Sequence, residues 1–139
     1  MARFCVDASA VVAWLIPGQR TPIIEETWTR LRRGEDFLTA PPLLYAECTS
    51  VLREQVGEVL THGDALAMVE DLFELPISAL GELRLYLRAL ELAEGLQRKK
   101  AYDMQYLAAA ELQRAELLTL DRGLFEAASQ LGVPARLLR

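Results

Sequence analysis

Histidine and cysteine are scarce in this chain, which has one histidine and two cysteines among its 139 residues. Cys5 and Cys48 are too few and too far apart for a disulfide framework or a zinc site. Both have apolar neighbours, so we expect them to be small buried hydrophobes. His62 lies in a typical helix-capping segment, away from every candidate acid, which argues against histidine-centred catalysis. The sequence also lacks a glycine-rich phosphate loop and the nucleophile-elbow pattern of serine hydrolases.

Long apolar runs are missing too, because none approaches the roughly 20 residues that span a bilayer. The first residues do not have the layout of a signal peptide, since Asp7 interrupts their apolar stretch. We therefore expect a cytoplasmic protein with no membrane association. A hydrophobic share of 52% with 25% charged residues is typical of a globular chain. Without repeats or a linker, residues 1–139 are expected to form a single domain.

Short apolar runs alternate with longer helical patterns, which predicts an α/β fold with a mainly parallel sheet. Strands are expected at residues 3–6, 37–39, 75–77, 117–120 and 135–138, with 75–77 at the sheet edge because it contains a proline. Helices are expected at about 9–15, from 22 to a stop near Gly34, at 42–60 with Gly57 only weakening it, after a cap at Thr61, and at 82–94, 102–114 and 124–131.

Four acids occupy comparable places in this pattern. Asp7 and Asp121 each follow a predicted strand, whereas Glu47 and Asp103 lie in the early turns of predicted helices. In parallel α/β sheets these places meet at the carboxyl edge of the sheet, where ligands bind. Oxygen-rich clusters hold Mg²⁺ or Mn²⁺, and two such ions about 3.5–4 Å apart drive phosphoryl chemistry. Each acid alone is as readily explained as a turn, a helix cap or a solvated residue.

The net charge of −5 excludes a broad basic surface for nucleic acid. Leaving the four acids out of the count gives a nearly neutral scaffold, and bound cations would neutralise the cleft itself. The acidity is therefore compatible with a metal-dependent nuclease. Arg98, Lys99 and Lys100, just before Asp103, could contact RNA phosphates or simply form a solvated loop.

The four acids and their neighbours resemble the successive signatures of PIN-domain nucleases, closest to the VapC-like toxins of type II toxin–antitoxin pairs. The resemblance rests on Val6-Asp7-Ala8-Ser9, Ala46-Glu47, Tyr102-Asp103 with Tyr106-Leu107-Ala108, and Leu118-Thr119-Leu120-Asp121. Each motif is short, but the ordered set spans essentially the whole chain. One departure is Met104, which stands where family members often have a small residue.

The resemblance implies a three-layer α/β/α sandwich and an Mg²⁺-dependent endoribonuclease, with Mn²⁺ as a substitute. It assigns the metal site to Asp7, Glu47, Asp103 and Asp121, and supporting hydroxyls to Ser9 and Thr119. A metal-activated water would leave 5′-phosphate and 3′-hydroxyl ends. The expected partners are RNA, a small antitoxin and a second copy of the chain. The alternatives are a non-catalytic RNA- or protein-binding module and a structure-specific DNA nuclease.

Overall fold

The fold is built on one five-stranded sheet in which every strand pairing is parallel. The computed structural model describes all residues 1–139. Its strands are β1 (Arg3–Val6), β2 (Phe37–Ala40), β3 (Ser78–Ala79), β4 (Glu116–Thr119) and β5 (Ala135–Leu137). They lie in the order β3-β2-β1-β4-β5, so the first strand of the chain is central. This arrangement confirms the predicted α/β class.

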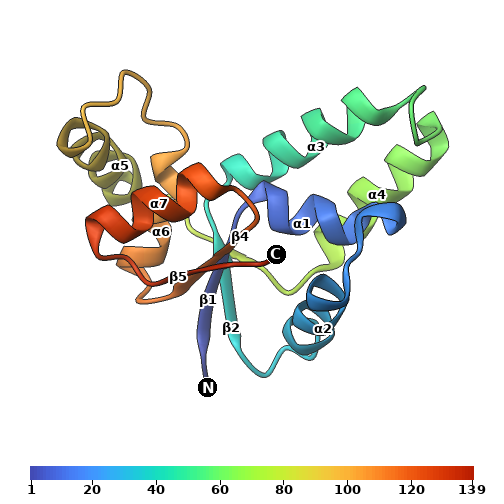
Figure 1. The fold of residues 1–139 in the computed structure, drawn as a ribbon, viewed down its shortest axis with the longest axis horizontal. Helices are drawn as coiled ribbons and strands as arrows, with labels where there is room; N and C mark the ends of the chain where they lie inside the picture. The colour runs from blue at the N-terminus through green and yellow to red at the C-terminus, as the bar shows by residue number, and fades with distance from the viewer.

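Helices cover both faces of the sheet. They are α1 (Ala8–Leu15), the 3₁₀ turn η1 (Pro17–Gln19), α2 (Pro22–Leu31), α3 (Leu43–Gln55), α4 (His62–Glu74), α5 (Leu83–Gly95), α6 (Met104–Leu112) and α7 (Arg122–Leu131). Figure 1 shows α1 to α4 gathered on one side and α5 to α7 on the other. Right-handed crossovers explain this division, because the chain moves one way along the sheet after β1 and the other way after β3. The predicted three layers are therefore confirmed.

Polar caps determine where several helices begin. Asp7 and Asp121 are the N-caps of α1 and α7, and each accepts a backbone N–H of the first helical turn. Thr61 and Asp64 form a reciprocal capping box at α4, as the sequence pattern predicted. Gly132 ends α7 with a φ of 72°, a left-handed conformation that favours glycine. Two of the four candidate acids thus have a structural role at the carboxyl edge of the sheet.

Two predicted elements were wrong in their extent. The helix expected at 42–60 ends at Gln55, because Val56 is extended and Gly57 has a φ of 90°. The Gln55 carbonyl then accepts three backbone N–H groups from the turn that follows. The edge strand expected at 75–77 lies at Ser78–Ala79, since Leu75 still caps α4 through its N–H. Pro76 has no N–H to donate to a ladder, so pairing starts only beyond it.

The core confirms the sequence reading of the cysteines. Cys5 and Cys48 are free and buried, and burial raises the pKa of both thiols, that of Cys48 to about 12. Trp28 is also fully buried, and its indole N–H donates to the Ala10 carbonyl at 3.0 Å. None of the helices combines the length and the apolar content that crossing a bilayer requires.

Candidate active site

One small cavity at the carboxyl edge of the sheet brings all four acids together. Its volume is about 150 Å³, and it is lined by Asp7, Glu47, Asp103 and Asp121 together with Ala8, Ser9, Tyr106 and Leu124. The acids come from the starts of α1 and α7, the second turn of α3, and the residue that precedes α6. Residues more than a hundred positions apart thus share one site because parallel strands end at one edge.

Asp7 is the most buried of the four acids, with only 4% of its surface exposed. Its carboxylate accepts the Ala10 backbone N–H at 3.1 Å, the Ser9 hydroxyl at 2.7 Å and the Thr119 hydroxyl. Burial raises the pKa of Asp7, while these three hydrogen bonds lower it and the charge of Asp121 raises it. The net effect is a raised pKa, so the folded protein disfavours the ionised carboxylate.

The hydroxyls of Ser9 and Thr119 connect the start of α1 to the segment after β4. The Leu120 N–H donates to Ser9 Oγ and the Asp121 N–H donates to Thr119 Oγ1, each at 2.9 Å. Both hydroxyls also donate to Asp7, so each of them is a donor and an acceptor at the same time. These bonds orient Asp7 and also set the backbone that carries Asp121.

Glu47 has a partner that the sequence did not reveal. The hydroxyl of Tyr106, on α6, donates to Glu47 Oε1 at 2.5 Å, although 59 positions separate the two residues. Tyr106 is 3% exposed, and burial followed by the neighbouring Glu47 raises its pKa. The sequence offered one signal for this contact. Tyr106 lies one turn after Asp103, and a buried phenol needs a hydrogen-bond partner.

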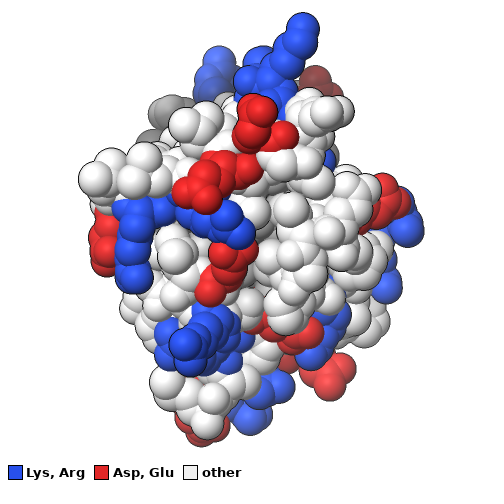
Figure 2. All heavy atoms as spheres, turned by 90° about the vertical axis from the view of Figure 1, so that its left-hand side faces the viewer, with Lys and Arg blue, Asp and Glu red and all other residues white.

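Asp103 pairs with the first residue of the basic run. Arg98 Nη1 lies 2.8 Å from Asp103 Oδ2, and both side chains are about one-third exposed. Lys99 and Lys100 are exposed and form no ion pair. Figure 2 shows acidic and basic side chains interspersed with wide uncharged areas on the face at the left of Figure 1. A broad basic footprint is therefore absent from that face.

Asp121 completes the set at the start of α7, where its Oδ1 accepts the Leu124 N–H at 3.1 Å. The space beside this oxygen is narrow, since a Cβ atom at Gly123 would lie 3.3 Å from Asp121 Oδ1. Asp121 is otherwise exposed to solvent. One carboxylate oxygen caps the helix, and the other has no hydrogen-bond partner within the protein.

The donor set suits a hard divalent cation, because all four candidate ligands are carboxylates. Burial is the main cause of the raised pKa of Asp7, and the charge of Asp121 raises it further. In this conformation no three acidic, cysteine or histidine side chains are close enough together to hold a metal ion. Each acid instead has a hydrogen-bond partner of its own, from Thr119, Tyr106, Arg98 or the backbone.

Comparison with known proteins finds one family model and one relative that match most of the chain. The model of the PIN domain matches residues 4–130. Ribonuclease VapC3 of Pyrobaculum aerophilum is 29% identical over 136 residues, which cover 95% of this chain and 99% of that protein.

Solved structures show the same fold at low sequence identity. DNA-bound VapBC from Salmonella typhimurium superposes with a TM-score of 0.74 at 15% identity, over the full length of both chains. VapBC2 from Rickettsia felis, bound to a promoter DNA fragment, gives a TM-score of 0.69 at 11% identity and covers 96% of each chain. At these identities the likeness concerns the fold alone.

Proposed function

Because the chain belongs to the PIN-domain family, we propose that it is a metal-dependent endoribonuclease whose clustered acids hold Mg²⁺ or Mn²⁺. The single observation that carries this proposal is the meeting of four carboxylates, from four separate elements, around one small cavity. These acids are Asp7, Glu47, Asp103 and Asp121. A cluster of this kind repels itself unless cations or protons compensate its charge.

The chain's own residues would prepare the site in distinct ways. Ser9 and Thr119 hold the Asp7 carboxylate in one orientation, and Tyr106 does the same for Glu47. Arg98 forms an ion pair with Asp103 and so compensates the charge of one of the four acids. A bound divalent cation supplies a nucleophilic water at neutral pH and a counter-charge for the phosphate. In-line attack on a phosphodiester would leave 5′-phosphate and 3′-hydroxyl ends.

The test is a cleavage assay with matched variants. Wild-type protein should cut single-stranded RNA in Mg²⁺ or Mn²⁺ and should be inactive with a chelator. Asp7→Asn and Asp121→Asn should lose cleavage while their circular dichroism spectra stay native. An RNA substrate and a DNA substrate of the same sequence distinguish a ribonuclease from a DNA nuclease.

Two outcomes would contradict this assignment. Retained metal-dependent cleavage by highly purified Asp7→Asn protein would show that the activity resides elsewhere. If calorimetry detects no Mn²⁺ binding to the wild type and no nucleic acid is cut, the chain is a non-catalytic binding module.

We also propose that the chain is the toxin of a type II toxin–antitoxin pair and works as a homodimer. The support for the toxin role is the similarity of the chain to a protein named as a VapC ribonuclease and to chains of VapBC structures, and the homodimer is what the family resemblance implies. Expression should arrest growth, and Asp7→Asn should relieve the arrest. A small protein encoded next to this chain should bind it and suppress cleavage.

A further inference from the structure

The largest cavity of the protein lies far from the acids, at the opposite edge of the sheet. Its volume is about 720 Å³, compared with about 150 Å³ for the cavity of the acids. It is formed where β1, β4 and β5 begin and where α6 and α7 end. A second hollow of about 580 Å³ shares Phe4, Arg30 and Arg136 with it, so the two are neighbours.

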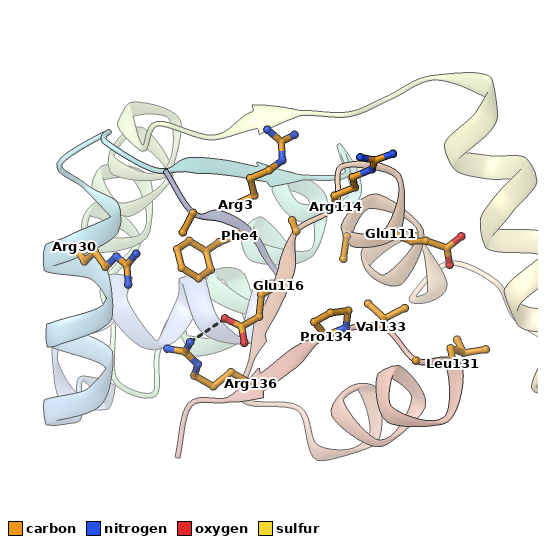
Figure 3. A pocket seen from close by; sticks show the side chains of 14 residues that line it. Arg3, Phe4, Arg30, Glu111, Arg114, Glu116, Leu131, Val133, Pro134 and Arg136 are labelled. Carbon is orange, nitrogen blue, oxygen red and sulfur yellow. Dashed lines mark hydrogen bonds and ion pairs between the residues drawn. The ribbon is translucent and has the colours of Figure 1, made fainter.

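Four arginines surround this space, which we call the arginine cavity: Arg3, Arg30, Arg114 and Arg136. Figure 3 shows Arg3 and Arg114 along one rim, with Arg30 and Arg136 on the other side of Phe4. The only acidic lining residues are Glu111 and Glu116, so the lining has a net charge of +2. The whole chain has a net charge of −5, which makes this a local reversal of sign.

Two of the four guanidinium groups have no carboxylate partner. Arg136 pairs with Glu116 at 2.9 Å, and Arg30 pairs with Asp36 at 2.8 Å. No ion pair includes Arg3 or Arg114, although Arg3 donates to the backbone carbonyl of Gln113 at the end of α6. That bond offsets part of the negative end of α6. The Arg114 guanidinium makes no hydrogen bond, so it is available to an anion.

The rest of the lining is apolar. Phe4, Val133 and Pro134 form part of the wall, with small alanines between them. The Arg30 guanidinium lies 5.1 Å from the centre of the Phe4 ring, which joins the charged rim to the apolar wall. Pockets that bind small organic ligands have this combination, with volumes of about 300–1,000 Å³.

We propose that the arginine cavity binds a small phosphate-bearing organic anion of the nucleoside-phosphate class. A guanidinium group matches phosphate oxygens with two parallel hydrogen bonds, and Arg114 is free to make them. The apolar wall would receive a flat heterocyclic ring. This site is separate from the carboxylate cleft, so the proposal does not depend on ribonuclease activity.

Calorimetric titration with adenosine 5′-diphosphate tests the proposal, in a chelator so that no metal bridges the nucleotide to the acids. Wild-type protein should bind it, whereas Arg114→Gln should bind at least tenfold more weakly. Arg114 has no partner in the fold, so this variant should unfold at the wild-type temperature. Arg53→Gln, on α3 and away from the cavity, is the matched control and should bind like the wild type.

Three results would overturn the proposal. The first is the absence of binding at millimolar nucleotide. The second is wild-type affinity in both Arg114→Gln and the double variant Arg3→Gln/Arg114→Gln, provided that both are folded. The third is inorganic phosphate or adenosine binding as tightly as the diphosphate, because the site needs both the charge and the ring. Unchanged affinity in Asp7→Asn would support the arginine cavity over the carboxylate cleft.

Discussion

Replacing Asp7 with asparagine should make the metal-free protein more stable at neutral pH, although it should abolish cleavage. The amide keeps the helix cap, since asparagine is as good an N-cap as aspartate. Its oxygen can accept from the Ala10 N–H and the Ser9 hydroxyl, as the carboxylate does. Its NH₂ group can donate to Thr119 Oγ1, whose own proton can then turn towards Ser9 Oγ at 3.4 Å. The main change is therefore the removal of a buried charge.

The direction in which the pKa of Asp7 shifts determines the sign of this effect. It is raised from its ordinary value of 3.8, with burial as the largest cause. The folded state therefore holds the Asp7 proton more tightly than the unfolded state does. Stability supplied by this proton is complete below 3.8 and declines as pH rises through the raised folded-state value. Because the fold disfavours the ionised carboxylate, we expect asparagine to raise the unfolding free energy of the metal-free protein at neutral pH.

Urea denaturation in chelator, followed by circular dichroism between about pH 4 and pH 8, measures the effect. The quantity to plot is the difference in unfolding free energy between Asp7→Asn and wild type. Asp36 and Asp64 have lowered pKa values, so their contribution to the unfolding free energy is lost in acid. This loss is the same in both proteins and cancels in the difference. The difference should grow with pH and then level off. A variant that is less stable than wild type at pH 7, or a difference independent of pH, would refute the reasoning.

Three further changes test neighbouring contacts. Tyr106→Phe removes the donor to Glu47 and should weaken Mn²⁺ binding about tenfold in calorimetry, with the fold retained; unchanged affinity would contradict a positioning role. Thr119→Val should lower the unfolding free energy by about 2–3 kcal/mol, because it leaves Asp7 Oδ2 and the Asp121 N–H without a partner, while Thr119→Ser should be nearly neutral. Neutralising residues 98–100 should weaken RNA binding and flatten its salt dependence, with a slope change of about 0.7 per lost phosphate contact; an unchanged slope would leave these residues as a solvated loop.

Most of the sheet and helix pattern could be predicted from local sequence. Apolar runs ending in an acid marked β1 and β4, and capping residues such as Thr61 marked helix starts within a residue or two. The failures occurred where local signals competed. Gly57 is tolerable in a helix, but here it takes a φ of 90° and the chain turns. β3 was misplaced because a two-residue edge strand has almost no periodicity to detect.

The sequence by itself determined the kind of acids, their order and their places after strands and at helix starts. Those places could be predicted because apolar runs and helix caps are local patterns. Parallel strands then bring the places together at one edge of the sheet. Only the tertiary structure decided what each acid contacts. The partners Thr119 and Tyr106 lie 112 and 59 positions from Asp7 and Glu47. Likewise, Arg3 and Arg136 line one cavity although they lie at opposite ends of the sequence. Such neighbours result from packing across the sheet, which local sequence patterns do not predict.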